Sequence, residues 1–253
     1  MNAFQRIATI ISYEWKRTLA KKKFFVFVIL AFAVQILIFV VFNYLFTNPP
    51  LMMPPIFLEQ LEQTMPIMWI IEALAPQGLF MSLIAIMISG GSMSEEYEHG
   101  TSDLLLSKPI TRIEYMAGKY LGGVSLLGFV VALTTALGAI LAISFFGPQE
   151  HLQFVLHVYL AIVYSNLVFL SLAFMFSEVF RRTTLALLSA IGIFIASMVT
   201  SGVLSGVYAF TREQLYLDVS KWLPDWCGSN FPDFVIRELV SIPPTPFVSA
   251  ADV

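Results

Sequence analysis

Five long apolar runs without acidic or basic residues constrain this chain most, because a helix of about 20 such residues crosses a bilayer. The runs cover Phe24–Phe46, Gln77–Met93, Tyr120–Phe146, Phe154–Phe176 and Leu185–Phe210. The second run is the shortest, and it can extend upstream through Pro66–Ala75. Charged residues make up only 12% of the chain and its mean hydropathy is +0.80, so it lacks the polar surface of a soluble globule. The sequence predicts an all-α polytopic transmembrane bundle of about five spans and excludes a soluble enzyme.

The basic residues predict how this bundle is oriented. Eleven of the 14 Lys and Arg residues lie before the first span, between the second and third, or between the fourth and fifth. Loops rich in Lys and Arg stay on the cytoplasmic side, so the N-terminus is expected there. We therefore expect a transmembrane domain over residues 24–210 and an extracytoplasmic segment over residues 211–253. The first run is too long for a signal peptide and is interpreted as a retained span.

Residues 1–23, before the first span, predict an amphipathic helix on the cytoplasmic membrane surface. Apolar residues recur there at helical steps of three and four: Phe4, Ile7, Ile11, Trp15 and Leu19. Basic residues follow at Lys21, Lys22 and Lys23, where they can attract anionic lipid. The alternative is a basic topology signal alone, but the lysines by themselves would not need the apolar stripe.

Residues 94–119, between the second and third spans, contain the helix start and stop signals of a structured loop. Gly100 is suited to end a helix that leaves the membrane, and Thr101 or Ser102 to cap a short new helix. Pro109 ends that helix. Thr111-x-x-Glu114 is a capping box that predicts the start of the helix leading into the third span.

Three adjacent leucines, Leu104, Leu105 and Leu106, lie on the predicted short helix. Exposed leucines in a cytoplasmic loop need cover. They either pack on the protein's own helix ends and the membrane interface, or dock into a groove of a cytoplasmic partner. The periodicity leaves both interpretations open.

The order of these signals resembles a known family. An acidic helix end, Gly-Thr, a leucine-rich turn, Ser-Lys-Pro-Ile-Thr-Arg and Glu-Tyr-x-x-Gly-Lys together resemble the type-two permease family of ATP-binding-cassette transporter membrane subunits. The resemblance implies a multi-pass subunit of a prokaryotic plasma-membrane transporter, in particular an exporter, paired with a second permease copy or a related permease. It implies that one set of residues faces a separate ATPase subunit: Glu95, Glu96, Glu98, Gly100, Thr101 and Leu104–Leu106, with Arg112 and Lys119 flanking them. The family usually has six spans, one more than the runs here.

No ATP site is recognisable in the chain. Gly118-Lys119 is followed by Tyr120 and lacks the spacing of a phosphate-binding loop. We therefore expect no cofactor in this chain, and ATP and Mg²⁺ to be bound by the partner ATPase. The third, fourth and fifth spans contain no Asp, Glu, Lys or Arg, which argues against an ion-coupled transporter. The net charge of −3 and the absence of a long basic run argue against nucleic acid as a partner.

Two other functions remain as alternatives. A membrane scaffold or assembly factor would use the same loop to recruit a cytoplasmic partner without ATP turnover. An intramembrane metalloprotease would use Glu95 and Glu96, but only His99 lies beside them in the sequence, which is a weak metal-ligand set.

Small residues spaced by four predict close helix contacts. They occur at Gly118 and Gly122, at Gly138 and Ala142, and at Gly202 and Gly206. Such pairs let helix backbones approach one another. Packing within one chain is the simpler explanation for each pair, and dimerisation is the alternative.

Overall fold

The computed structural model describes residues 3–48, 65–100 and 110–240, and within these ranges it contains helices and no strand. The longer helices are α1 (Ala3–Leu19), α2 (Lys22–Thr47), α5 (Ser82–Ser89), α8 (Arg112–Phe146), α9 (Val155–Phe180), α10 (Thr183–Thr211) and α12 (Pro224–Val240). The shorter ones are η1 (Met65–Ile67), α4 (Met68–Leu74), η2 (Gln77–Met81), α6 (Ser94–Glu98), η3 (Leu152–Phe154) and α11 (Gln214–Ser220).

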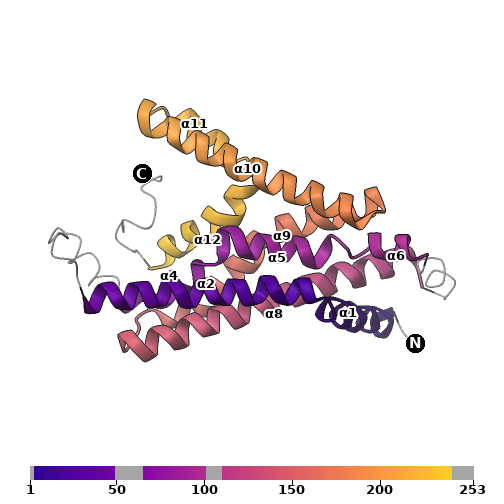
Figure 1. Cartoon of the computed structure of the whole chain (residues 1–253), viewed down its shortest axis with the longest axis horizontal. Coiled ribbons are helices and arrows are strands. Elements are labelled where there is room, and N and C mark those ends of the chain that lie inside the picture. The colour runs from indigo at the N-terminus through magenta and orange to yellow at the C-terminus, as the bar shows by residue number, and fades with distance from the viewer. Residues whose placement is uncertain (1–2, 49–64, 101–109, 241–253) are drawn as a thin grey trace.

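Five helical stretches are long and apolar enough to cross a membrane: Phe24–Thr47, Met65–Glu98, Arg112–Phe146, Leu152–Phe180 and Thr183–Thr211. The predicted all-α bundle of five spans is therefore confirmed. Figure 1 shows α2, α5, α8 and α9 running along the long axis of the molecule, with α1 and α6 toward one end and α4 toward the other.

The second span is not one regular helix. It includes the predicted upstream extension as η1 and α4, and then changes to a π-helix over Gln77–Met81. Pro76 has no N–H to donate, and the Met81 N–H bonds to the Pro76 carbonyl at 3.1 Å, a five-residue step. A second interruption follows Ser89, where the chain turns before α6 begins at Ser94. Such breaks in a span are tolerated where neighbouring helices cover the backbone.

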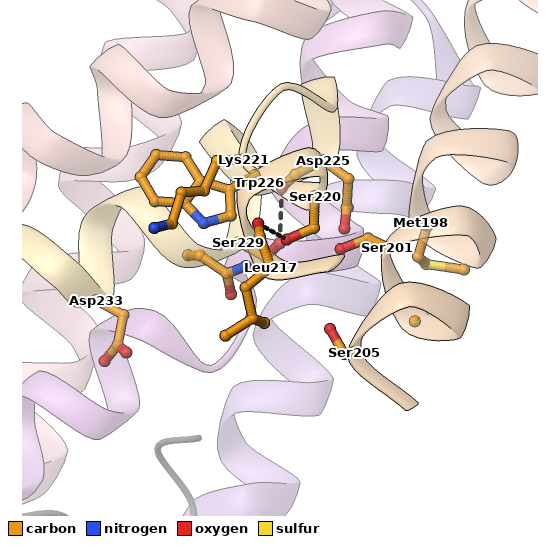
Figure 2. Close-up of a pocket in the computed structure, with 12 residues that line it drawn as sticks. Met198, Ser201, Ser205, Leu217, Ser220, Lys221, Asp225, Trp226, Ser229 and Asp233 are labelled. Atoms are coloured by element: carbon orange, nitrogen blue, oxygen red, sulfur yellow. Dashed lines mark hydrogen bonds between the residues drawn. The ribbon is translucent and has the colours of Figure 1, made fainter. Parts of the chain in front are cut away.

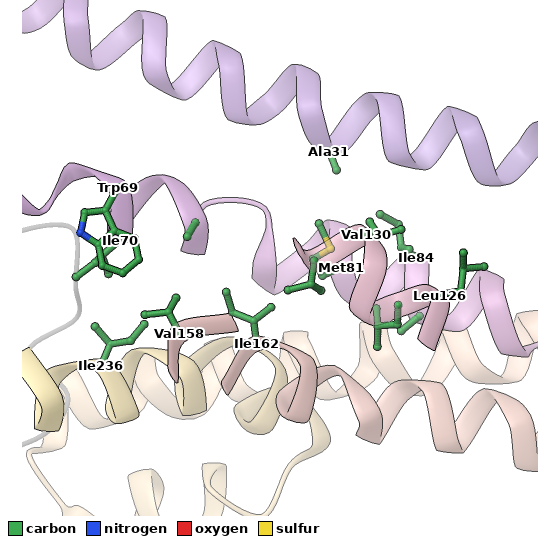
Figure 3. Packing of buried hydrophobic residues seen from close by; sticks show 14 of the residues in the cluster. Ala31, Trp69, Ile70, Met81, Ile84, Leu126, Val130, Val158, Ile162 and Ile236 are labelled. Carbon is green, nitrogen blue, oxygen red and sulfur yellow. The ribbon is translucent and has the colours of Figure 1, made fainter. Parts of the chain in front are cut away.

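The main apolar core joins α2, α4, α5, α8, α9 and α12. Figure 3 shows Trp69 and Ile70 of α4 near Val158 of α9 and Ile236 of α12, with Leu126 and Val130 of α8 further along the bundle. A smaller cluster fastens α10 to α5 and α9, where the rings of Phe169 and Phe194 meet edge to face at 5.1 Å. Beyond this cluster α10 diverges from the bundle (Figure 1).

The segment after α10 is more structured than its hydropathy suggests. α11 and α12 follow the turn at Arg212, and α12 packs against α9 and η2. Gly228 of α12 lies so close to the bundle that a Cβ there would meet Phe169 at 3.1 Å and the Ser82 hydroxyl at 3.2 Å. The predicted extracytoplasmic segment thus contributes a helix to the bundle, while residues 241–253 lie outside the described ranges.

Candidate coupling site

The site begins with the close approach of α1 to α8, at the predicted cytoplasmic end. The glycines of the predicted pair, Gly118 and Gly122, lie on the buried face of α8. A Cβ on Gly118 would come within 2.9 Å of Ile10, and one on Gly122 within 2.8 Å of the Glu14 Cβ. The pair therefore serves packing within one chain, and the missing side chains make room for a glutamate on the inward face of α1.

Lys119 lies between these glycines and is the centre of the site. Its side chain is 0% exposed. The ammonium donates to Glu14 Oε1 at 2.8 Å, to Glu96 Oε1 at 2.5 Å and to the Ser92 carbonyl at 2.6 Å. A buried ammonium makes three donors available, and here three oxygens from α1, α6 and the turn between α5 and α6 accept them. One side chain thereby joins three separate segments of the chain to α8.

A second layer of charges extends this cluster toward the start of α2. The Arg17 guanidinium lies 2.8 Å from Glu14 and 3.5 Å from Glu95, and it donates to the carbonyls of Gly91 and Ser92. Lys21 bonds to Glu95 at 2.5 Å. We call these six residues the charge cluster: Glu14, Arg17, Lys21, Glu95, Glu96 and Lys119. Its three acids and three bases balance, as a buried ionic group requires.

The inner and outer residues of the charge cluster differ in solvent exposure. Glu14, Glu96 and Lys119 are buried, whereas Lys21 and Glu95 are partly exposed. Burial lowers the pKa of Lys21, and the neighbouring Arg17 charge acts in the same direction. The hydrogen bond and charge of Glu95 oppose that shift. The inner part of the cluster therefore depends on internal pairing, while its outer edge meets solvent.

Glu98 and Tyr97 connect α6 to α9 and α10. Glu98 accepts hydrogen bonds from the Thr183 N–H at 3.0 Å and the Thr183 hydroxyl at 2.8 Å, so it caps the start of α10. Tyr97 donates to the Glu178 carboxylate near the end of α9. The Ser177 hydroxyl accepts from the N–H groups of Met93 and Ser94. α6 and the turn before it are thus tied to the end of α9 and the start of α10.

The predicted coupling residues differ in their surroundings. Glu95, Glu96 and Glu98 all bond to residues of the chain itself, and Glu96 is 4% exposed. Gly100 ends the described part of this segment with φ +65°, a left-handed conformation that glycine adopts readily. Arg112 is exposed at the start of α8. Thr101 and Leu104–Leu106 lie outside the described residues, so their predicted contact with a partner stays a prediction.

The predicted capping box at the start of α8 is present. Glu114 N–H donates to the Thr111 hydroxyl, and the Glu114 carboxylate accepts from the Thr111 N–H at 3.0 Å. The same carboxylate lies 2.7 Å from Arg6 of α1. A local helix signal therefore also ties the start of α8 to the surface helix.

The predicted surface helix is α1, and its apolar residues occupy one flank. Phe4 is 81% exposed and Leu19 is also exposed, whereas Ile7, Ile11 and Trp15 are half-buried. The Trp15 indole donates to the Ser125 hydroxyl of α8 at 2.8 Å. Lys22 is exposed, and the side chain of Lys23 lies outside the described set. Contact of this flank with lipid remains a prediction.

The periodicity argument missed two buried residues. Glu14 shares a helical face with Ile10 and Thr18, the three fully buried positions of α1, and this face lies beside the apolar stripe rather than opposite it. A glutamate spaced four from both neighbours and facing a Gly-x-x-x-Gly segment was the available signal. The other missed residue is Glu72 of α4, which is 0% exposed.

A polar cavity of about 300 Å³ lies between α10, α11 and α12, away from the charge cluster. Figure 2 shows Ser201 and Ser205 of α10 facing Asp225 and Ser229 of α12, with Lys221 and Trp226 at its edge. Burial raises the pKa of Asp225, and its hydrogen bond with Ser229 acts in the opposite direction. A cavity with this lining is wide and polar enough to hold water or a small polar molecule.

Comparisons with known proteins agree with this architecture. The family model described as "ABC-2 family transporter protein" matches residues 8–217, which run from within α1 to within α11. The chain is also similar to the uncharacterized protein YhcI of Bacillus subtilis (strain 168), with 25% identity over 161 residues. That alignment covers 56% of this chain and 51% of YhcI, so the chain spans about half the length of this curated relative. On the family match, this chain belongs to the ABC-2 family of transporter membrane proteins.

Proposed function

We propose that this chain is the permease subunit of an ATP-driven exporter in a prokaryotic plasma membrane. Two copies, or this chain and a related permease, form the translocation pathway. A separate ATPase subunit binds ATP and Mg²⁺ and docks on residues 94–119. The family membership supports the permease role. The observation that carries the coupling role is the charge cluster, which fastens α6, at the start of the predicted docking loop, to α1 and α8.

The charge cluster is suited to transmit motion because its inner residues Glu14, Glu96 and Lys119 are buried and its charges balance. Displacing α6 alone would separate Glu96 from Lys119 and leave both charges in a site with little water. Breaking one partner from a buried ion pair costs about 3–5 kcal/mol, so moving the attached helices together is cheaper. A push on the docking loop would therefore move α1, α6 and the first turns of α8 as one body, and the long α8 would carry that motion across the membrane.

Affinity purification in a mild detergent tests the proposal. We expect a nucleotide-binding protein to copurify with the chain and to hydrolyse ATP in the eluate. The variant with Leu104, Leu105 and Leu106 changed to Ser should lose that partner. A matched control, Leu215→Ser, alters a leucine of α11 that is 65% exposed and should keep it.

Other outcomes of the purification would point to other functions. A copurifying protein without an ATP site would support the scaffold alternative and contradict the transporter proposal. Equal loss of the ATPase in both variants would contradict docking at the leucines. No observation favours the metalloprotease alternative, since both glutamates it needs bond to ammonium groups, Glu95 to Lys21 and Glu96 to Lys119.

A further inference from the structure

Glu72 is an acidic residue buried inside the predicted membrane domain, far from the charge cluster. It lies on α4 with Trp69, Ile70 and Ala73, all of them between 0% and 1% exposed. Glu72 itself is 0% exposed. Among the residues that the structure describes, neither of its carboxylate oxygens has a hydrogen-bond partner.

The Gln35 amide beside Glu72 has an unused acceptor and no unused donor. The Gln35 amide donates to the Glu72 carbonyl at 3.1 Å and to the Thr134 carbonyl at 3.0 Å, which uses its NH₂ group. Its Oε1 is buried and left without a partner in the described structure. The buried Thr135 hydroxyl of α8 also has no partner there, and a hydroxyl can both donate and accept. Gly138 permits this packing, because a Cβ there would meet Gln35 Nε2 at 2.9 Å and Glu72 Cβ at 3.2 Å.

Within the part of the chain that the structure describes, no ammonium or guanidinium pairs with the Glu72 carboxylate. α2 has no charged residue after Lys23, α8 has none after Lys119, and η1 and η2 have none. α9 has an exposed His157 near its start and Glu178 near its end. The undescribed residues 49–64 contain no basic residue at all.

Two tyrosines on these elements are also accounted for. Tyr44 of α2 is 63% exposed. The Tyr159 hydroxyl of α9 lies beside Gly128, ten residues before Gly138 on α8. Neither therefore donates a hydrogen bond to the Glu72 carboxylate.

An ionised carboxylate cannot be sustained in this environment. A buried charge requires a partner or a metal, and otherwise the group changes its protonation state and becomes neutral. A protonated carboxyl carries no charge to be compensated, and its O–H is a donor for an unused acceptor such as that of the Gln35 amide. We propose that Glu72 is a proton-binding site of the membrane domain, occupied in this conformation and emptied when the contacts between α2, α4 and α8 open to water.

The structure also indicates the side from which water would reach the site. Trp69, one helical turn before Glu72, donates its indole N–H to the Glu150 carbonyl at 2.8 Å. The Glu150 N–H bonds to the Pro66 carbonyl at 2.7 Å. These contacts close the end of α4 at the predicted extracytoplasmic face. When they separate, the carboxyl proton passes to water on that side, and the reverse step reloads the site on closure.

Infrared spectroscopy of the purified full chain tests the proposal without needing a transport substrate. The chain is measured at neutral pH in a maltoside detergent, which has no carbonyl group of its own. We expect a protonated-carboxyl C=O band in the wild-type chain that is absent from Glu72→Gln. The control, Glu150→Gln, changes a glutamate whose side chain is 68% exposed and should keep the band.

Three results would overturn the proposal. One is a wild-type spectrum without the band, or a Glu72→Gln spectrum that retains it. Another is a band that appears only after Na⁺ and K⁺ are removed, which would assign the site to an alkali cation instead. The third is a Glu72→Gln chain that fails to fold, because glutamine copies the neutral acid and should be tolerated if the proton is bound. None of these results depends on an ATPase partner, so the permease proposal stands or falls separately.

Discussion

Replacing Lys119 with methionine tests whether the charge cluster holds the predicted cytoplasmic end together. Methionine retains an unbranched apolar chain and removes only the ammonium, which bonds to Glu14, Glu96 and the Ser92 carbonyl. Both carboxylates are buried, so each keeps its cost of burial while losing a counter-charge. The expected loss is about 3–5 kcal/mol in the free energy of unfolding, as for other buried pairs with one partner removed.

A second substitution distinguishes this electrostatic loss from a packing loss. Glu96→Gln in the Lys119→Met background restores the charge balance of the cluster. Glu14 then still has Arg17 at 2.8 Å and the Ser92 hydroxyl at 2.8 Å. We expect the double variant to be about 2 kcal/mol more stable than the sum of the single effects predicts, within the range observed for residues in one ionic network.

Unfolding of the purified chain by SDS in mixed micelles measures all four proteins of this double-mutant cycle. The control is Lys221→Met directly after α11, where the Lys221 side chain is 46% exposed and pairs with Asp218 at 3.1 Å. Exposed pairs contribute little, so the control should stay within about 0.5 kcal/mol of the wild type. The reasoning fails if Lys119→Met is as mild as the control, or if the effects of Lys119→Met and Glu96→Gln simply add.

Two further predictions concern packing and pH. Gly122→Ala should destabilise the chain by about 1–3 kcal/mol, because its Cβ would lie 2.8 Å from that of Glu14. Gly202→Ala, where nothing lies within 4 Å, should instead stabilise it by about 0.5–1 kcal/mol; the same SDS titration compares them. Burial raises the pKa of Asp225, so the folded state holds this proton more tightly than the unfolded chain, and stability falls as pH rises from about the ordinary value of 3.8 through the raised one. Asp225→Asn should therefore melt at a higher temperature than the wild type at neutral pH, and the difference should vanish in acid; an equal difference at both pH values would contradict the assignment.

The five spans and the start of α8 could be predicted because both signals are local. An apolar run must become a helix inside a bilayer, since no other single segment satisfies its own backbone there. The Thr111 and Glu114 capping box operates within one turn, so its geometry follows from the sequence alone. The Gly118 and Gly122 pair predicted a close helix contact, but the partner helix, α1, became evident only in the fold.

The break in the second span and the return of α12 could not be read from hydropathy. Hydropathy measures how favourably lipid can surround a segment. It does not apply to α4 and α12, because other helices cover most of their surface. Glu72 interrupts the apolar run of the second span, which is why the predicted span began after it at Gln77. In α12, polar residues such as Asp225 and Asp233 line a cavity, while Ile236 on the same helix enters the core. Protein contacts therefore decide these positions.

The charge cluster was beyond sequence analysis for a related reason, and its arrangement affects where a partner can dock. Glu14, Arg17 and Lys21 precede the first span, Glu95 and Glu96 lie at the end of the second, and Lys119 lies near the start of the third. No local sequence pattern predicts that charges so far apart in the chain pair with one another. Glu96 is buried and its carboxylate is paired with the Lys119 ammonium. It therefore contributes little negative potential that could attract an ATPase. We therefore expect recognition of the partner to depend on Leu104–Leu106 and the exposed Arg112, while the glutamates hold the surface behind them in place.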